Sequence, residues 1–457
     1  MKRVVVREHG RIVRWTRDGP PPAGTSRLYL ERRLYDRLKR FDQHGRPESD
    51  RVFAWGDGQA AAQQWVGVVQ VPGLQLEVLP KVDALAPGEA DAHDARRNLL
   101  YMLAVGGDVP VRSRDMARLT SRSAPLSETL SALFADRLLG ELLKGPARAY
   151  VARQENLRRF KGKLLVAAQA RHNAAHRERF FCRFDEFSDD TLMNRIFRSA
   201  CLALLDATRT PATQELLRRC LLLLDRVSDV VVHDELFDKV VLTRQNERFG
   251  DVLQFCRLIL SGRSPTAQSG RSRSFSLLFD MNHVFESFVA GFLRRHVLPR
   301  MEGYRLFPQA RRRRRHLLSS EGRGVLALRP DLLVEAPDGS RVVLDTKWKR
   351  LSSTGSRGGV AAADLYQLFA YLHRYGCHRS VLLYPRASGI SPRDFQVIDR
   401  HDGPSGEQVA VRFVDLNRDL HREAERSLLA DELHELLTEA FSSRIAHAEA
   451  STAGGAA

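Results

Sequence analysis

The sequence predicts an α+β protein of several domains, with a β-containing N-terminal module, a helical middle region and a C-terminal α/β domain built on a mixed sheet. Three observations support this prediction. Short β-like runs alternate with Pro and Gly turns up to about residue 92, and leucines and phenylalanines recur at helical spacing from 95 to 263. From about residue 274 the order becomes helix, strand, hairpin, helix and strand, which suits a mixed sheet covered by helices.

These composition changes define four predicted segments. They are an N-terminal module at 1–92, a mainly helical region at 95–263, a C-terminal α/β domain at 274–445 and a flexible tail at 446–457. Two linkers are predicted, a stretch rich in Ala, Pro and Gly at 83–94 and one rich in Ser, Gly, Pro and Arg at 264–273. Within the first module we expect strands at 66–71 and 74–79 and a helix at 26–41. In the last domain we expect strands at 304–307, 395–398 and 409–416 and a final helix at 420–441.

Composition places the chain among soluble proteins that bind polyanions. It has 457 residues, a formal net charge of +17 and 43% hydrophobic residues, which favours folded domains and a nucleic-acid partner. The five cysteines are scattered and odd in number, so we expect buried free thiols in a reducing cytoplasm. The N-terminus is too charged for a signal peptide, and no apolar run is long enough to span a bilayer. We therefore expect a cytoplasmic protein without a membrane segment.

The most informative motif is a hairpin in the C-terminal half. Asp331 is followed by a Pro-Asp-Gly turn and then by Asp345 and Lys347. If Glu335 and Arg341 close the loop, an antiparallel register sets Asp331 opposite Asp345. Strand alternation then places Lys347 on the same face, and a slip of one residue would separate these groups. The apolar residues of the two strands face the other way, toward the core.

Two neighbouring carboxylates repel one another unless a cation lies between them. Hard oxygen ligands suit Mg²⁺ or Mn²⁺, so Asp331 and Asp345 are candidate metal ligands. A lysine beside such a site can hold the attacking water or stabilise charge on a phosphoryl group, which points to phosphodiester hydrolysis. The alternative is a surface hairpin with an ordinary salt bridge, because so short a motif also occurs by chance.

Two helices supply candidate supporting residues. Asp364 is the expected N-cap of a helix on which Gln367 and Tyr371, four residues apart, share one face. Glu286 lies on a helix before the hairpin whose phenylalanines form a buried stripe. Plain amphipathic helices would account for the same residues.

Several segments resemble known nucleases. The Gln367–Tyr371 spacing resembles the motif that follows the Asp-x-Lys strand in RecB-type nucleases, and in PD-(D/E)xK nucleases an acidic residue at the place of Glu286 often completes the metal site. The chain as a whole resembles the McrC family over roughly residues 10–440. The similar segments, in order, are 65–69, 76–81, 98–103, 150–156, 160–163, 185–194, 281–292, 329–349, 364–371 and 382–385.

The resemblance implies more than the residues themselves. McrC proteins are the restriction subunit of the modification-dependent 5-methylcytosine restriction system, which defends against foreign DNA such as that of viruses. They lack a nucleotide-binding motif and work with an AAA+ GTPase motor (McrB-like) that recognises modified double-stranded DNA. By this pattern Asp331, Asp345 and Lys347 occupy the catalytic positions of a PD-(D/E)xK endonuclease that uses Mg²⁺. The N-terminal region would contact the motor and stimulate GTP hydrolysis, and this chain, which has no Walker A motif, would bind no nucleotide itself.

A run of five arginines precedes the hairpin and is not expected from the family. Arg311, Arg312, Arg313, Arg314 and Arg315 would place guanidinium groups beside the site, where they could bind DNA phosphates in a salt-sensitive way. A solvated loop is the alternative. Nothing in the run reads a base sequence.

Two other functions stay open at this point. The chain could be a non-catalytic regulator that binds the motor and DNA, with the nuclease fold kept as a scaffold. It could also be a RecB-type exonuclease that acts on DNA ends, because the same three catalytic side chains would serve it.

Overall fold

The structure is a computed structural model that describes residues 1–16, 27–44, 47–81, 89–111, 124–261, 274–311, 313–351, 357–398 and 403–453. The chain forms two compact units, each of them discontinuous in sequence. The first comprises Met1–Arg3, Val68–Leu76 and Ala124–Leu277, and the second comprises Val4–Gly67, Glu77–Ser123 and Leu278–Ala457. Asp331, Asp345 and Lys347 all belong to the second unit. The linker predicted at 83–94 is wrong in its second half, because a helix begins at Glu89. Its first half and the linker predicted at 264–273 lie outside the described residues.

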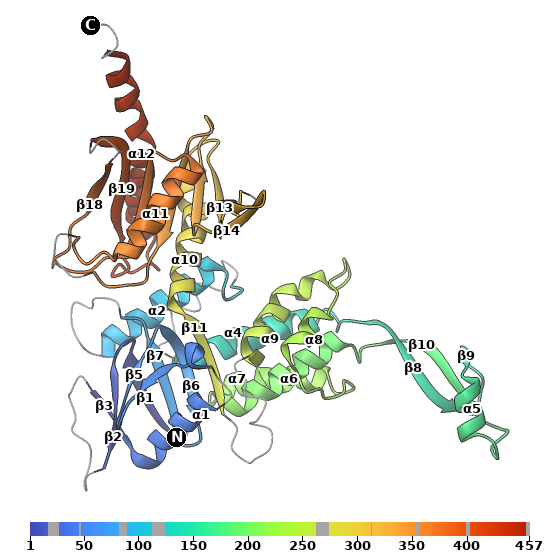
Figure 1. The fold of residues 1–457 in the computed structure, drawn as a ribbon. Helices are drawn as coiled ribbons and strands as arrows, with labels where there is room; N and C mark the ends of the chain where they lie inside the picture. The colour runs from blue at the N-terminus through green and yellow to red at the C-terminus, as the bar shows by residue number, and fades with distance from the viewer. Residues whose placement is uncertain are drawn as a thin grey trace. The chain divides into compact units, whose positions relative to one another are not determined.

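Two four-stranded sheets use most of the strands near the N-terminus (Figure 1). Their orders are β3-β2-β5-β4 and β1-β7-β6-β11. The strands predicted at 66–71 and 74–79 are confirmed as β6 and β7, which are almost wholly buried. The bounds are β1 (Lys2–Arg7), β2 (Arg11–Trp15), β3 (Arg27–Glu31), β4 (Phe53–Trp55), β5 (Gln59–Ala62), β6 (Trp65–Val71), β7 (Leu74–Leu79) and β11 (Phe275–Asp280).

The helix predicted at 26–41 is right only in its second part. Helix α1 runs over Arg32–Gln43, whereas Arg27–Glu31 forms β3, parallel to β2. Neighbouring side chains of this strand are both packed against the rest of the protein. Leu30 is fully buried, and the Tyr29 ring contacts the Trp15 ring edge-on with 5.5 Å between centroids. Pairing with β2 therefore makes Arg27–Glu31 a strand, although the spacing of its apolar residues predicts a helix.

Helices dominate the first unit, as predicted for the middle of the chain. They contact one another through a core that includes the ring pairs Phe134–Phe255 and Phe197–Phe249. The bounds are α4 (Leu126–Leu142), α6 (Leu192–Ala207), α7 (Pro211–Leu223), α8 (Asp234–Asp238) and α9 (Gly250–Ser261).

A three-stranded sheet interrupts these helices and was not predicted. Strands β8 (Ala149–Leu157) and β10 (Phe180–Ser188) pair antiparallel over nine residues, and β9 (Lys163–Leu164) joins β10. Together with α5 (Val166–His172) they form an arm that extends from the helices of this unit (Figure 1). Exposed side chains occupy both faces of β8, so the strand has no buried stripe for a sequence pattern to reveal.

A six-stranded mixed sheet forms the centre of the C-terminal region, in the order β12-β15-β16-β17-β19-β18. The β16–β17 and β17–β19 pairs are parallel, and the other three pairs are antiparallel. This arrangement confirms the predicted mixed sheet. The bounds are β12 (Arg305–Pro308), β15 (Leu332–Glu335), β16 (Arg341–Thr346), β17 (Arg379–Pro385), β18 (Arg393–Ile398) and β19 (Pro404–Val414).

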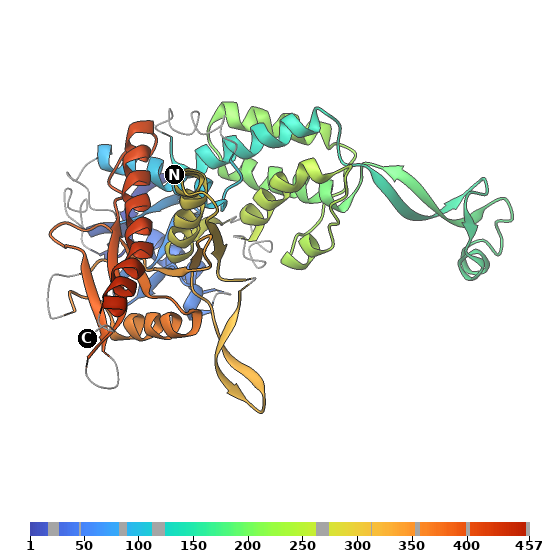
Figure 2. The ribbon, with the colours of Figure 1, turned by 90° about the horizontal axis from the view of Figure 1, so that it is seen from above.

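Four helices surround this sheet or lead into it. α2 (Glu89–Gly106) packs against α10 (Met281–Phe292), which precedes the sheet in sequence. α11 (Ala362–Tyr375) and α12 (Glu423–Ala453) both contact β16, β17 and β19, and Figure 1 shows α11 in front of the sheet and α12 behind it. The separate hairpin of β13 (Arg315–Ser320) and β14 (Arg323–Leu328) projects away from α11 in Figure 2.

The remaining predictions concern the cysteines, the membrane and the tail. All five cysteines are free and buried, as expected. In the described part of the chain no helix is long and apolar enough to cross a membrane. The final helix continues to Ala453, and residues 454–457, the end of the predicted tail, lie outside the description.

Candidate active site

The β15–β16 hairpin has the register that its sequence predicts. Glu335 pairs with Arg341 and Leu332 with Leu344, so continuing the same register by one residue places Asp331, just before β15, opposite Asp345. The turn is closed by hydrogen bonds from Ala336 N to Ser340 O and from Gly339 N to Ala336 O. The φ of +82° at Gly339 favours glycine over any other residue there.

Asp345 is a buried carboxylate whose oxygens are poorly satisfied. Its side chain is 0% exposed, and among the described residues its carboxylate bonds only to the ammonium of Lys347, with Nζ 2.5 Å from Oδ2. Burial, and then the charge of Asp331, raise the pKa of Asp345 to about 7. A buried carboxylate with unused lone pairs is the arrangement that a hard cation would satisfy.

Asp331 is oriented by the strand opposite to it. Its Oδ2 accepts hydrogen bonds from the backbone N and from Oγ1 of Thr346, each at 2.7 Å. These bonds fix the Asp331 carboxylate at the end of β16, and after burial its charge is the largest influence on the pKa of the Asp345 carboxyl. The two carboxylates therefore lie near one another, as the spacing predicts.

Lys347 joins the carboxylates to α11. Its Nζ also donates to Oε1 of Gln367 at 3.3 Å, and Nε2 of Gln367 donates to the Tyr371 hydroxyl at 2.8 Å. Burial disfavours the charged ammonium, but the charge and hydrogen bond of Asp345 outweigh it and raise the pKa of Lys347. The side chains predicted from the Asp-x-Lys and Gln-x-x-x-Tyr spacings therefore meet at one place.

Glu286 approaches the site from α10. Burial, followed by the charge of Asp331, raises the pKa of its carboxyl, and Lys347 partly opposes this shift. Its Oε1 accepts a hydrogen bond from Nε2 of Gln309 at 3.1 Å. Within the described residues no three His, Cys, Asp or Glu side chains form a ready-made metal site. The fit of a cation therefore depends on the unused oxygens of Asp345 and on the mutual repulsion of these acids.

Asp364 does not cap its helix. α11 begins at Ala362 with Ala361 as N-cap, which places Asp364 inside the first turn. The carboxylate is buried and accepts hydrogen bonds from the Tyr384 hydroxyl at 3.2 Å and from Lys349 Nζ at 3.4 Å. These long-range donors replace the backbone amides that an N-cap would bind.

Two residues that the sequence did not single out hold the site in place. Gln309, at a φ of +51°, donates its backbone N to Asp331 O at 2.6 Å and its side chain to Glu286. Glu8 accepts hydrogen bonds from the indole Nε1 of Trp348, which follows Lys347, at 2.8 and 3.0 Å. Burial raises the pKa of Glu8 to about 7. No spacing or motif in the sequence links either residue to the hairpin.

The arginine run divides into residues with different contacts. Arg313 donates to Glu335 Oε1 at 3.2 Å, and Arg315 donates to the carbonyl of Arg374 on α11. Arg311 bonds to the side chain of Gln309, and both Arg311 and Arg314 are exposed. Arg312 lies outside the described residues. Arg313 is exposed as well, so Arg311 and Arg314 are the exposed members, among those described, that do not take part in the ion pair with Glu335.

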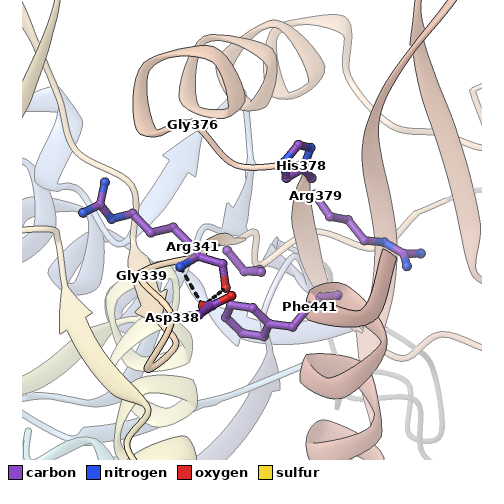
Figure 3. A pocket seen from close by; sticks show the side chains of 10 residues that line it. Asp338, Gly339, Arg341, Gly376, His378, Arg379 and Phe441 are labelled. Carbon is purple, nitrogen blue, oxygen red and sulfur yellow. Dashed lines mark hydrogen bonds between the residues drawn. The ribbon is translucent and has the colours of Figure 1, made fainter. Parts of the chain in front are cut away.

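A cavity of about 190 Å³ opens at the other end of the hairpin (Figure 3). It is lined by Asp338, Gly339, Ser340, Arg341, Val342, Gly376, His378, Arg379, Ala440 and Phe441. Arg341 begins β16, whereas Asp345 lies near the end of that strand. This cavity is therefore separate from the carboxylates and from Lys347.

The chain is similar to components of a restriction system. A family model described as "McrBC 5-methylcytosine restriction system component" matches residues 60–385. No curated protein matches the chain. A chain in the refined half-complex from a tetradecameric assembly of Thermococcus gammatolerans McrB AAA+ hexamers with bound McrC has a TM-score of 0.63 and 21% identity, covering 95% of this chain and 100% of that one. A chain in the cryo-EM structure of the Thermococcus gammatolerans McrBC complex has a TM-score of 0.45 and 24% identity, covering 65% of this chain and 90% of that one. The first of these likenesses shows a common fold.

Proposed function

Because the chain belongs to the family of McrBC 5-methylcytosine restriction system components, we propose that it is the nuclease subunit of such a system. The proposed activity is Mg²⁺-dependent endonucleolytic hydrolysis of modified double-stranded DNA in the cytoplasm, by a PD-(D/E)xK domain. One observation carries the proposal. Asp345 is buried beside a second carboxylate, and among the described residues the Lys347 ammonium, 2.5 Å from Oδ2, is the one group bonded to its carboxylate. A scaffold gains no stability from such a group, whereas a metal-dependent phosphodiesterase requires it.

Asp331 and Asp345, with Glu286 on α10, are the residues that would hold Mg²⁺ or Mn²⁺. Their oxygens are hard ligands, and burial, followed by the charge of Asp331, raises the pKa of each of the other two carboxyls. When bound, the ion would polarise a phosphate oxygen and acidify a water molecule. The hydrogen bonds from Thr346 to Asp331 hold one carboxylate ready, so little reorganisation is needed on binding.

Lys347 acts as a cation in this mechanism, because its raised pKa keeps it protonated. Asp345 and Gln367 hold its ammonium in place, and Tyr371 in turn holds Gln367. From there the ammonium stabilises the negative charge that develops on the phosphate oxygens as water attacks. The water oxygen forms a new bond to phosphorus, the bond from phosphorus to a deoxyribose oxygen breaks, and that oxygen takes up a proton.

Replacing Lys347 with glutamine tests this role. We expect cleavage to fall by on the order of 10²–10³-fold, because a neutral amide cannot stabilise the developing charge. The matched control is Lys349→Gln, since Lys349 is the next lysine and pairs with Asp364 rather than Asp345. Single-turnover cleavage of methylated DNA with the motor partner and GTP measures both variants. Equal loss in the two variants would argue against a catalytic role for Lys347.

The exposed arginines near the hairpin are the proposed DNA contacts. We expect the double variant Arg311→Gln, Arg314→Gln to weaken DNA binding and to lower the slope of log K against log salt by about 0.9 for each phosphate that is no longer neutralised. Arg315→Gln is not a suitable comparison, because its guanidinium bonds to the backbone of α11. Fluorescence anisotropy with a short duplex over a salt series gives the slope. An unchanged slope would remove these two residues from the DNA path.

The proposed partner is an AAA+ GTPase motor. A structure with the same fold contains McrB AAA+ hexamers with bound McrC. We assign the motor contact and the stimulation of GTP hydrolysis to the N-terminal module at 1–92, and we expect no nucleotide on this chain itself. The motor would select the modified DNA, and this chain would cut it.

A further inference from the structure

The hairpin of β13 and β14 does not pair with any other strand of the described residues. It forms its own two-stranded sheet, from Arg315 paired with Leu328 to Ser320 paired with Arg323. Glu321 and Gly322 form the turn, both with positive φ. Figure 2 shows this hairpin projecting away from α11 and the six-stranded sheet. Its outer part therefore contributes little to the packing of the domain.

The base of the hairpin is fixed next to the candidate active site. Arg374 of α11 donates to the carbonyl of His316 at 2.8 Å, and Arg315 donates to the carbonyl of Arg374. The Arg315 guanidinium lies 5.6 Å from the centre of the Tyr375 ring, and Leu328 is buried in the core under α11. The same helix holds Lys347 through Gln367, and the chain passes from Leu328 to Asp331 within three residues. The direction of the hairpin is thus set by the elements that build the site.

The outer part of the hairpin carries aliphatic side chains in water. Leu318 is 58% exposed, its cross-strand partner Val325 is 41% exposed, and Leu326 is 61% exposed. Leu326 also has a φ of +57°, a conformation that a leucine adopts only at a cost. Single exposed leucines are common, but a cross-strand aliphatic pair with a third exposed leucine next to it in sequence, all on one projecting hairpin, marks a binding surface.

The charge around these side chains indicates what they bind. Arg311, Arg314 and Arg323 are exposed on the hairpin and its approach, and Glu321 is the one acidic residue among the described positions 309–330. The hairpin therefore combines exposed arginines with exposed aliphatic side chains on its outer part. This combination fits a polyanion that has an apolar interior. Duplex DNA has both properties, because its phosphates flank stacked bases. Leucine and valine cannot read hydrogen-bonding base edges, so insertion between base pairs fits this end better than readout of sequence.

We infer that the β13–β14 hairpin is a DNA wedge, in which Leu318, Val325 and Leu326 enter a base step beside the bond to be cut while the nearby arginines bind phosphates. This inference depends on the proposed function, because it takes DNA as the substrate. Opening a base step bends the duplex, and bending brings the neighbouring phosphate toward the carboxylates at the foot of the hairpin.

The test uses the full chain and a short duplex that carries 2-aminopurine at several steps. Binding of the unmodified chain is expected to raise 2-aminopurine fluorescence, because the probe becomes unstacked. The double variant Leu318→Ser, Leu326→Ser is expected to bind about tenfold more weakly, with no rise in fluorescence and an unchanged salt slope. The matched control is Leu428→Ser on α12, which changes another exposed leucine, 48% accessible, and should behave like the unmodified chain. Equal circular dichroism spectra of the variants exclude unfolding as the cause.

The possible outcomes separate this inference from the proposed function. Binding of DNA by the unmodified chain without a fluorescence rise overturns the wedge and leaves the nuclease proposal standing. No binding of DNA under any salt condition overturns both. Loss of motor association in the Leu318→Ser, Leu326→Ser variant, with DNA binding and fluorescence unchanged, makes the hairpin a protein-docking surface instead. Asp345→Asn should keep the fluorescence rise even though it cannot cut.

Discussion

Replacing Asp345 with asparagine is expected to abolish DNA cleavage, with a loss on the order of 10³-fold or more. The change keeps the shape of the side chain and removes its negative charge. Without that charge a cation at the site loses a ligand, and the Lys347 ammonium loses the ion pair that positions it at 2.5 Å. Single-turnover cleavage with the motor partner, GTP and Mg²⁺ measures the effect.

The same variant should fold at least as well as the unmodified chain. The pKa of Asp345 is raised from 3.8 to about 7, so between these values the native state binds more protons than the unfolded state. The contribution of this group to stability therefore falls as the pH rises through that window, and above pH 7 the native state bears the full cost of a buried charge. Asparagine removes that cost. Thermal unfolding in a chelator at pH 8 should thus show no loss of stability, and direct titration should show weaker Mg²⁺ or Mn²⁺ binding.

Asp338→Asn is the matched control for this experiment. Asp338 lies in the turn of the same hairpin, where its Oδ1 accepts hydrogen bonds from the backbone N and the hydroxyl of Ser340. It is far along β16 from the site, so its loss should leave cleavage within a few-fold of the unmodified rate. Full cleavage by Asp345→Asn, or equal loss in both variants, would contradict the assignment of Asp345.

Replacing Gly291 with alanine is expected to cause the largest loss of stability. A Cβ at this position of α10 would lie 2.1 Å from the carbonyl oxygen of Val105 and 2.8 Å from its carbonyl carbon. Both atoms are backbone of α2, so the two helices must move apart, at a cost of about 3 kcal/mol. Because α10 also carries Glu286, cleavage should fall as well. The midpoint of thermal unfolding, followed by circular dichroism, checks this expectation.

Gly140→Ala provides the comparison. Gly140 lies within α4, and a Cβ there would meet no atom within 4 Å. Alanine is the better helix former by up to about 1 kcal/mol, so this variant should be neutral or slightly stabilised. The chain has two compact units, so the transitions should be assigned to each unit before the midpoints are compared. An unchanged midpoint in Gly291→Ala would mean that α2 and α10 do not pack as closely as described.

The sequence was most informative where spacing along the chain decides position. A short turn sets the register of Asp331 against Asp345, and strand and helix periods place Lys347, Gln367 and Tyr371. Each of these inferences spans few residues. The contacts of these side chains then bear out the spacing, while their catalytic roles stay predictions.

The contacts that the sequence did not reveal are long-range or depend on unusual backbone. Glu8 bonds to Trp348, which lies 340 positions further along the chain, and no local pattern could connect them. Gln309 bonds to both Asp331 and Glu286 from a left-handed backbone conformation, which no sequence pattern predicts for a glutamine. Aspartate is a common N-cap residue, which is why the sequence predicts that role for Asp364. Instead its carboxylate accepts a hydrogen bond from the distant Tyr384 hydroxyl.

Cleavage of covalently closed circular methylated DNA tests most directly whether this chain is an endonuclease. The reaction contains the chain, its AAA+ motor partner, GTP and Mg²⁺, and GTP hydrolysis is followed in parallel. We expect the unmodified chain to cut the circles and to stimulate GTP hydrolysis, and Asp345→Asn to stimulate hydrolysis without cutting. Stimulation by both with cutting by neither would contradict the nuclease assignment and leave a regulator of the motor, and cutting of linear DNA alone would indicate an exonuclease.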